Sequence, residues 1–392
     1  MTVKLYDTDP YGIEFDAKVT GVTEVNSKRG YILDRTLFFP EEGGQSCDKG
    51  TLNNLNVTAV NIKNDTVIHF VDGFLNEGDS VHGVIDWDRR FRNMQCHSAE
   101  HIFTGLVHNI KGFNNVGFHL SDNTATMDYD GFLSSEEIAE LEVRANVIII
   151  ENRPIKAEYP DSETLKTLEY RSKKEIEGPV RIVTVEGVDV CACCAPHVRS
   201  TGEIGLFKVI SSEKYKGGVR IHYLAGFRAI EDYEERLSAL RDISAVLSAK
   251  PGAEADTVRN MLDDNKKLKF ELVNVTNRYI ETKIRNEYRD GSRFFLYIGG
   301  ADEISGIDYA AKVIRGLVDS FALFLGDDES GYKFIIESDT TDTGDLLDKL
   351  KKRYNAKCGG KNGSFRGSMA ISETDIKRDF STMESTFGAG NE

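Results

Sequence analysis

The sequence has little of what membrane-spanning, secreted or disulfide-stabilised proteins depend on. Its six cysteines are too sparse among 392 residues for a disulfide scaffold, and no apolar run is long enough to cross a membrane. The N-terminus lacks the basic region and the apolar stretch of a secretory signal. We therefore expect a cytoplasmic protein with no membrane association.

Positive charge is scarce as well. The chain has 49 lysines and arginines against 64 aspartates and glutamates, which gives a formal net charge of −15. Contacts with phosphate dominate the affinity of most nucleic-acid-binding proteins and need cationic side chains. This balance excludes a broadly basic nucleic-acid-binding protein, so any contact with RNA has to come from a local patch.

The length and the patterning of the chain predict an α+β protein with several domains. Residues 1–89 carry short β-rich runs separated by glycines, which indicates a small β-barrel-like domain. Within it, Val57–Ile62 and Thr66–Val71 predict a β-hairpin. Residues 90–228 mix helical and strand patterns and predict an α+β domain, whereas residues 291–392 are typical of an α/β domain.

Between these parts, residues 229–290 predict a helical hairpin. Apolar residues recur at helical spacing on both sides of Pro251-Gly252, which breaks the pattern into two helices. The apolar stripe supports two alternatives: the hairpin holds the last domain at a distance, or it joins two chains into a homodimer. Elsewhere, helices are predicted at Cys96–Asn109, Ser134–Ile150, Tyr309–Ser320 and Asp345–Tyr354, and strands at Arg181–Val185, Phe294–Ile298, Phe321–Leu325 and Lys333–Glu337.

Four residues are spaced as ligands of one metal ion. His97 and His101 stand at i and i+4, on one face of a predicted helix, and Cys193 and His197 form a second pair with the same spacing. Either pair alone is as common on a surface or in a core as at a metal. The chain has only 8 histidines, yet three belong to these two short segments. We therefore predict a zinc site in which Cys193 is the sulfur ligand, with Cys191 and Cys194 as alternatives.

The same residues carry a resemblance to a known family. A histidine pair spaced HxxxH, a later CxxxH and the stretch Thr201–Gly205 together resemble the editing domain of alanyl-tRNA synthetases and its free-standing, AlaX-like relatives. The resemblance covers most of the chain. It implies zinc-dependent hydrolysis of mischarged aminoacyl-tRNA in trans, with tRNA, and tRNA(Ala) in particular, as the partner. The chain has no room for an aminoacylation domain, so we expect no charging activity.

Two glycine-rich segments extend this resemblance. Phe38–Gln45 is similar to a motif of the family, which implies that Gly43, Gly44 and Gln45 line the substrate site. Near the end, Cys358–Ala370 is similar to the glycine-rich motif of the C-terminal domain that the synthetases carry. The residues implied there in tRNA binding are Gly359, Gly360, Lys361, Gly363 and Arg366.

The chain departs from the family pattern at two places. Where the family has Cys-Gly-Gly-Thr-His, this chain has Cys-Cys-Ala-Pro-His at residues 193–197. The amino acid that is removed is therefore left open between serine and glycine. Glu100 replaces the usual threonine before His101, which creates the motif HxxEH. Glu100 is predicted as a general base or as a partner of a ligand, the alternative being a solvated helix residue.

HxxEH is also the motif of inverted zinc peptidases, in which the glutamate activates a water molecule. A zinc peptidase is therefore an alternative function, although no downstream motif supplies the carboxylate ligand that such an enzyme needs. A second alternative is a non-catalytic RNA-binding protein with structural zinc, because four protein ligands usually mark a closed site.

Overall fold

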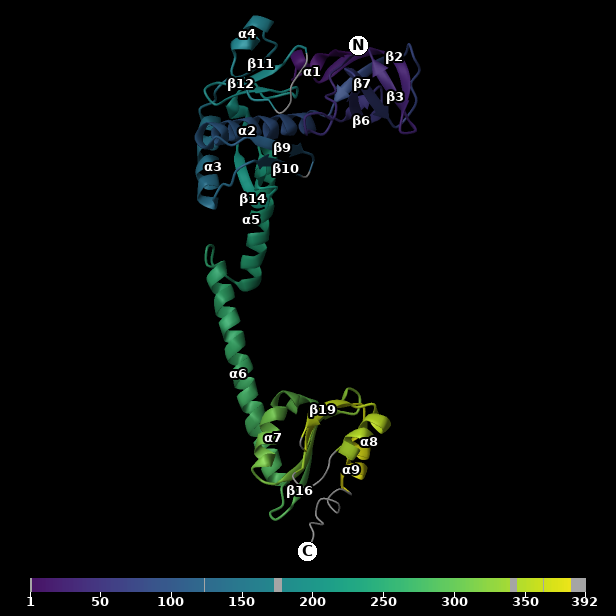
Figure 1. Cartoon of the computed structure of the whole chain (residues 1–392), viewed down its shortest axis with the longest axis vertical. Helices are drawn as coiled ribbons and strands as arrows, with labels where there is room; N and C mark the ends of the chain where they lie inside the picture. The colour runs from purple at the N-terminus through teal and green to yellow at the C-terminus, as the bar shows by residue number, and fades with distance from the viewer. Residues whose placement is uncertain (1, 123, 173–177, 339–343, 362, 382–392) are drawn as a thin grey trace. The chain divides into compact units, whose positions relative to one another are not determined.

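A computed structural model describes residues 2–122, 124–172, 178–338, 344–361 and 363–381 of the chain. These residues form two compact units, of which the first ends at Asp242 and the second begins at Ile243 (Figure 1). Both units contain helices together with β-sheet, several sheets in the first unit and one in the second, so the predicted α+β class is confirmed. In the described ranges, no helix combines the length and the hydropathy needed to span a bilayer.

The first unit starts with six strands that close on themselves in the order β2-β3-β7-β6-β5-β8. Alternate residues of β2, among them Phe15, Ala17 and Val19, are buried inside this sheet. The predicted hairpin is confirmed as the antiparallel pair of β6 and β7. The elements of this part are β1 (Val3–Lys4), α1 (Leu5–Thr8), β2 (Glu14–Val25), β3 (Lys28–Leu33), β4 (Arg35–Thr36), β5 (Gly50–Leu52), β6 (Leu55–Lys63), β7 (Thr66–Val71) and β8 (Ser80–Ile85).

Helix α2 (Trp87–Lys111) follows directly and forms the centre of the first unit. It includes the predicted helix but begins earlier, because the side chain of Asp86 accepts a hydrogen bond from the main-chain nitrogen of Arg89 at 3.1 Å and caps the N-terminus. The helix ends at Gly112, which adopts φ 72°. Its middle, from Asn93 to Gly105, is buried throughout.

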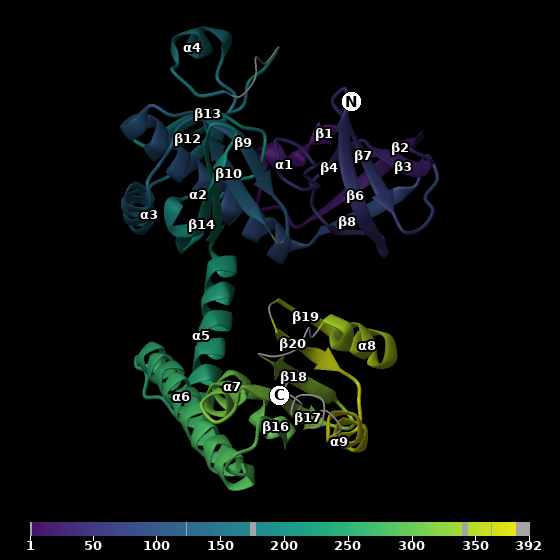
Figure 2. The same ribbon diagram turned by 60° about the horizontal axis from the view of Figure 1, so that its bottom comes forward.

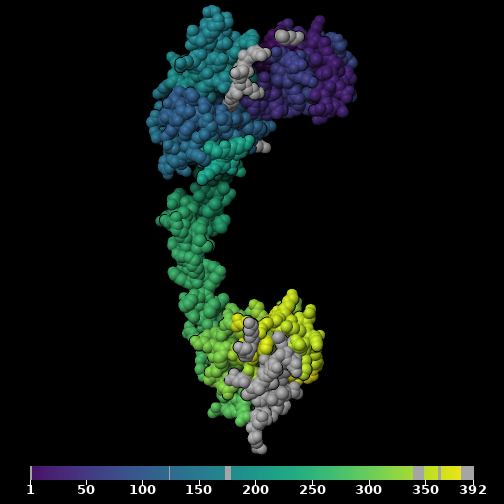
Figure 3. Space-filling view, in the orientation of Figure 1, coloured from purple at the N-terminus to yellow at the C-terminus, as the bar shows by residue number. Residues whose placement is uncertain are grey.

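The rest of the first unit packs around α2. A sheet in the order β14-β15-β10-β9 lies against α2 and α3, and the rings of Phe103, Phe207 and Tyr223 contact one another in tilted pairs in the core. The barrel and this part form one continuous surface (Figure 3). The elements are β9 (Asn115–Leu120), β10 (Ala125–Tyr129), α3 (Ser135–Ile150), β11 (Ile155–Glu158), α4 (Ser162–Thr167), β12 (Ile182–Val185), β13 (Asp189–Ala192), the 3₁₀ helix η1 (Thr201–Ile204), β14 (Phe207–Tyr215) and β15 (Gly218–Ala225).

Two long helices follow, α5 (Phe227–Leu247) and α6 (Glu254–Glu287). Both predicted helices are thereby confirmed, and Pro251-Gly252 lies in the turn between them. The apolar residues of α6 at coiled-coil spacing are exposed, Met261 by 56% and Leu272 by 64%. Their pairing within a hairpin or with a second chain stays a prediction.

The second unit is built on one sheet with the order β16-β17-β18-β20-β19 (Figure 2). Alternate residues of β17 face opposite layers: Phe321 packs in the core with α6 and α7, and Phe324 packs with α8 and α9. The elements are β16 (Phe294–Gly299), η2 (Ala301–Gly306), α7 (Ile307–Arg315), β17 (Ser320–Asp327), β18 (Gly331–Glu337), α8 (Gly344–Tyr354), β19 (Lys357–Lys361), β20 (Ser364–Met369) and α9 (Glu373–Ser381).

One predicted helix was too long. The helix expected from Tyr309 to Ser320 ends at Arg315, and Ser320 is the first residue of β17. The physical reason is Gly316, which caps the helix, since glycine loses more conformational freedom in a helix than other residues do.

Candidate metal centre

Two histidines lie on one face of α2. His97 and His101 are one helical turn apart, with ring centroids at 5.5 Å, and both side chains are buried. Residues four apart on a helix stand above one another, so both imidazoles project toward the same place. That place is inside the unit, between α2 and the loop after β13.

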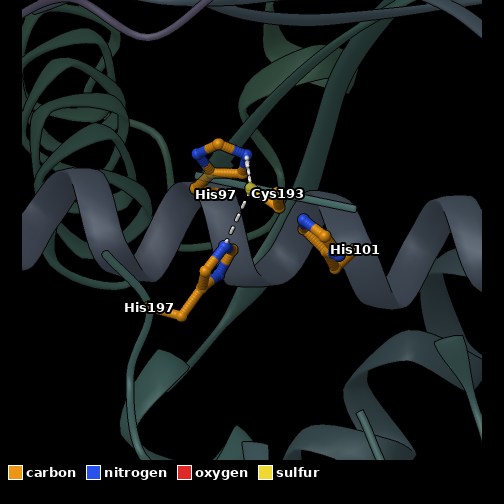
Figure 4. A group of neighbouring side chains, drawn as sticks. All are labelled: His97, His101, Cys193 and His197. Carbon is orange, nitrogen blue, oxygen red and sulfur yellow. Dashed lines mark hydrogen bonds between the residues drawn. The ribbon is translucent and has the colours of Figure 1, made fainter. Parts of the chain in front are cut away.

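The loop after β13 brings Cys193 and His197 to the two helix histidines. Arg181 holds this loop, since its Nη1 donates to the main-chain oxygens of Cys193 at 3.1 Å and of Ala195 at 2.8 Å. Cys193 Sγ lies 3.6 Å from His97 Nε2 and 3.3 Å from His197 Nε2, as the dashed lines in Figure 4 mark. The four side chains drawn there offer ligand atoms that all lie within 4.8 Å of one another. We call His97, His101, Cys193 and His197 the four-residue cluster.

Each imidazole of the cluster uses its Nδ1 for a partner outside it, which leaves its Nε2 for the cluster. The pairs are His97 Nδ1 with Gln45 Oε1 at 2.7 Å, His197 Nδ1 with Ser98 Oγ at 3.0 Å, and His101 Nδ1 with Asp189 Oδ2 at 2.9 Å. Histidines that bind metals are held in this way, because the bond at one nitrogen sets the tautomer and leaves the other nitrogen free to coordinate.

The structure separates the three candidate sulfur ligands. Cys193 lies in the cluster, while Cys191 is buried beside His101, where burial raises the pKa of its thiol to about 11. Cys194 faces the glycine-rich loop, and a Cβ on Gly43 would lie 3.7 Å from its sulfur. Burial raises the pKa of Cys194 as well. Because the thiolate is the form that binds metals, Cys193 is the candidate that the geometry favours.

The electrostatics of Cys193 and His197 suit a cation, whereas the surroundings of His101 favour its protonated form. Burial opposes ionisation of Cys193, but the imidazoles of His97 and His197 lower the pKa of its thiol well below the ordinary value. Burial lowers the pKa of His197 to about 3, so this imidazole is neutral at physiological pH. For His101, burial acts in the same direction, yet the hydrogen bond to Asp189 raises its pKa overall.

Glu100 is buried beside the cluster, so the alternative of a solvated helix residue is wrong. Its Oε1 accepts hydrogen bonds from Thr104 Oγ1 at 2.8 Å and from Asn115 Nδ2. Its Oε2 lies 4.0 Å from His101 Nε2. The Tyr129 hydroxyl is 2.8 Å from Thr104 Oγ1 and completes a buried polar network. The network holds the carboxylate with one oxygen on the side of the cluster.

The glycine-rich loop forms the wall of the cluster on the barrel side. Gly44 adopts φ +88°, and a Cβ there would lie 2.2 Å from the main-chain oxygen of Phe118, so only glycine fits. A main-chain hydrogen bond of 2.8 Å from Leu120 to Gly44 ties the loop to β9. The Gln45 side chain is completely buried, and its Nε2 has no hydrogen-bond partner among the described residues. A buried amide donor without a partner is costly and points to a ligand.

The residues predicted to contact tRNA lie in the second unit. Gly359, Gly360 and Lys361 belong to β19, Gly363 lies in the turn, and Arg366 belongs to β20. Arg366 is exposed and forms an ion pair with Asp308. The exposed side chains of Lys349, Lys351, Lys352, Arg353 and Lys357 lie on α8 and at the start of β19.

Four residues that support the cluster were not predicted from the sequence, namely Ser98, Thr104, Asn115 and Asp189. Ser98 and Thr104 lie on the same helix as the two histidines, and Asp189 lies two residues before Cys191, the first residue of the cysteine-rich segment. Only this closeness in sequence could have marked them. The third and fourth members of the cluster are Cys193 and His197 rather than a carboxylate, which disfavours the zinc peptidase.

Comparisons with known proteins agree with this geometry. The family described as threonyl and alanyl tRNA synthetase second additional domain matches residues 180–222, and class II (A) tRNA synthetases match residues 10–89. An alanine–tRNA ligase of Ignicoccus hospitalis is 34% identical over 64% of this chain, which spans only 29% of the ligase. The alanyl-tRNA editing protein AlaX-L of Pyrococcus horikoshii is 31% identical over 64% of each chain. The alanyl-tRNA editing protein Aarsd1 of Mus musculus is 25% identical over 93% of this chain and 90% of its own length.

Proposed function

The chain belongs to the family of free-standing, AlaX-like alanyl-tRNA editing proteins, and we propose that it hydrolyses the ester bond of mischarged aminoacyl-tRNA in trans. The observation that carries this proposal is the four-residue cluster, in which three imidazole Nε2 atoms and the sulfur of Cys193 converge beside the buried Gln45, whose Nε2 has no partner among the described residues. We propose tRNA(Ala) charged with serine or glycine as the substrate, and no aminoacylation.

We propose zinc as the metal of the cluster. Three nitrogens and one sulfur form the donor set that zinc prefers, in a tetrahedron with bonds of about 2.0–2.3 Å. The separations of 3.3 and 3.6 Å between Cys193 Sγ and two imidazole nitrogens are compatible with ligands around one such ion. The partners at the three Nδ1 atoms support the same assignment. When bound, zinc supplies Lewis-acid polarisation of the ester carbonyl.

Glu100 is the residue that we propose to accept a proton from the attacking water. Its carboxylate is buried and held by Thr104 and Asn115, so it needs no rearrangement to act. Its Oε2 is on the side of His101 Nε2, next to the place where the ester would lie. A buried carboxylate at this position also adds negative charge beside the cation.

Gln45 is the residue that we propose to donate to the carbonyl oxygen as negative charge develops on it. Its Oε1 is used by His97, which orients Nε2 without a partner of its own. A donor that is already oriented stabilises an oxyanion strongly, because no reorganisation is needed during the reaction. Gly43 and Gly44 let the main chain approach the substrate closely.

The second unit is proposed to contact the tRNA through Gly359, Gly360, Lys361, Gly363 and Arg366. The exposed lysines of α8 support this, because phosphate contacts need local positive charge in a chain of net charge −15. The apolar stripe of α6 supports a homodimer as a further proposal.

The proposal is tested by release of amino acid from tRNA(Ala) charged with serine, glycine or alanine. We expect rapid release of serine or glycine, little release of alanine, and loss of release in His101→Ala. The matched control is His82→Ala, since His82 is a half-exposed histidine on the barrel, outside the cluster. Release from none of the three tRNAs, with binding of tRNA retained, would favour the non-catalytic RNA-binding protein instead.

A further inference from the structure

The three imidazoles of the cluster differ in what holds their Nδ1. Gln45 and Ser98, the partners of His97 and His197, are uncharged. His101 alone has a carboxylate, that of Asp189, at 2.9 Å. An ionised carboxylate can only accept hydrogen bonds. Of the two neutral tautomers of His101, it therefore admits the one with the proton on Nδ1 and the lone pair on Nε2.

Asp189 is itself held by an arginine. Arg171 Nε lies 2.7 Å from Asp189 Oδ1, and Arg171 Nη2 lies 2.8 Å from Asp189 Oδ2, in a bidentate pair. The Asp189 side chain is 2% exposed and that of Arg171 is 15% exposed. Both oxygens of Asp189 are therefore engaged, and the one that accepts from His101 is shared with the guanidinium.

The main chain of Arg171 is tied to the strand that carries Asp189. Its nitrogen donates to Val190 at 2.8 Å, and its oxygen accepts from Ala192 at 2.9 Å. The same strand, β13, leads directly to Cys193. Arg171 is thus linked to the cluster twice, through Asp189 to His101 and through β13 to Cys193.

We infer that Arg171 and Asp189 are positioning residues of the metal centre, which hold His101 so that its Nε2 faces the ion. The guanidinium compensates the buried carboxylate, because a lone buried charge would be costly. The bidentate geometry keeps both carboxylate oxygens in place, and neither Arg171 nor Asp189 belongs to the four-residue cluster. The inference rests on the proposed metal site but not on the proposed deacylation.

A cavity marks the outer end of this chain of contacts. It has a volume of about 550 Å³ and is lined by Arg171, Asp189, Asn115 and Cys191, among others. The cavity lies on the side of His101 and Asn115, whereas Gln45 and the glycine-rich loop are on the barrel side of the cluster. Arg171 and Asp189 therefore both line the cavity, and Asp189 links its wall to His101.

A second ion pair in the same unit provides a matched control. Arg220 on β15 binds Asp128 on β10 with the same bidentate geometry, at 2.7 and 2.8 Å, and the Asp128 side chain is 8% exposed. Neither residue belongs to the cluster or bonds to the partners of its histidines. Loss of this pair removes a comparable structural contact without affecting a metal ligand.

The experiment compares Asp189→Asn, Arg171→Gln and Arg171→Lys with Asp128→Asn. Zinc affinity is measured by competition with a chromophoric chelator, and the visible spectrum of the Co²⁺-substituted full chain reports the ligand geometry. We expect zinc affinity to fall about 10- to 100-fold in Asp189→Asn, as for other partners of metal-bound histidines. In Arg171→Gln we expect a smaller decrease in zinc affinity. In Arg171→Lys we expect a smaller decrease still, because lysine keeps the positive charge.

The control Asp128→Asn is expected to keep the native affinity and the native Co²⁺ spectrum. The inference is overturned when the variants at positions 171 and 189 bind zinc with the affinity of the native chain. It is also overturned when Asp128→Asn lowers the zinc affinity as much as those variants do. Where Asp189→Asn does not fold, the two Arg171 variants carry the same test. A native chain that binds zinc but leaves aminoacyl-tRNA intact would contradict the proposed function alone.

Discussion

Histidines are buried in two regions of the first unit, and they are used differently. His69 in the barrel is completely buried, and both ring nitrogens have partners, Nε2 with Thr36 Oγ1 at 2.8 Å and Nδ1 with the main-chain oxygen of Tyr31 at 3.2 Å. His97, His101 and His197 are almost as deeply buried, yet each has a partner outside the cluster at Nδ1, and its Nε2 faces the other members of the cluster. Burial of a histidine therefore does not mark a candidate metal site, whereas several Nε2 atoms directed at one point do.

The largest effect is expected for a substitution that removes a residue of the cluster and leaves the barrel unchanged. His101→Ala removes one of the four proposed ligands, so the metal content should fall from about one ion per chain to a small fraction, and release of serine or glycine should stop with it. His69→Gln should keep its metal, since His69 is not part of the cluster. Elemental analysis of both purified variants checks this. Equal metal content in the two would contradict the comparison.

Glu100→Gln tests the residue beside the cluster without touching a ligand. The amide keeps the size of the side chain but cannot take a proton, so we expect kcat to fall by roughly 10²- to 10⁴-fold with the metal retained. Single-turnover release of serine from tRNA(Ala) measures the effect. The matched control is Glu140→Gln on the exposed face of α3. Native activity in Glu100→Gln would exclude the proposed role as a base.

Gln45→Glu separates the two functions of the Gln45 side chain. The carboxylate still accepts from His97 Nδ1, so the metal should stay, but the donor at Nε2 is lost. We expect kcat to fall by about 10²- to 10³-fold, the range for loss of one donor to an oxyanion. Gln45→Leu removes both functions and should also weaken metal binding. A normal kcat in Gln45→Glu would show that Nε2 has no part in the reaction.

The smallest effect concerns stability and the barrel alone. Burial lowers the pKa of His69 from 6.5 to about 4. The unfolded chain therefore takes up the proton first, and stability that is full above pH 6.5 is lost as the pH falls from about 6.5 to about 4. The loss approaches roughly 3 kcal/mol at the acid end of that window.

The loss of stability can be followed through Cys47, which is buried in the barrel core and becomes accessible when the barrel unfolds. In the native chain, a thiol reagent that reacts at acid pH should label Cys47 in urea more readily as the pH falls from 6.5 to 4. The dependence should be weaker in His69→Gln, which has no imidazole to protonate. An equal pH dependence in both proteins would show that other groups cause it.

Features that depend on the spacing of nearby residues, such as a helix face or a β-hairpin, could be predicted from the sequence. The i and i+4 positions of His97 and His101 were sufficient to place both on one face of a helix, and that helix is present as α2. The β-hairpin at residues 55–71 followed from two β-rich runs and a short turn. The end of α7 was missed because a single glycine, Gly316, decided it.

Partners at a distance could not be predicted in the same way. Asp189 bonds to His101 across 88 positions of sequence, and Gln45 bonds to His97 across 52. Such contacts depend on how β13 and the glycine-rich loop pack against α2, which no periodicity encodes. The choice of Cys193 among three cysteines also required the folded loop, since all three have nearly the same place in the sequence.

The most direct test of the account follows release of serine from Ser-tRNA(Ala) by chain that has been stripped of metal and then titrated with Zn²⁺. The account predicts that stripped protein releases no serine, that release returns in proportion to added zinc up to about one equivalent per chain, and that His101→Ala does not respond. Release by stripped protein at the native rate would contradict the claim that the four-residue cluster acts through a metal.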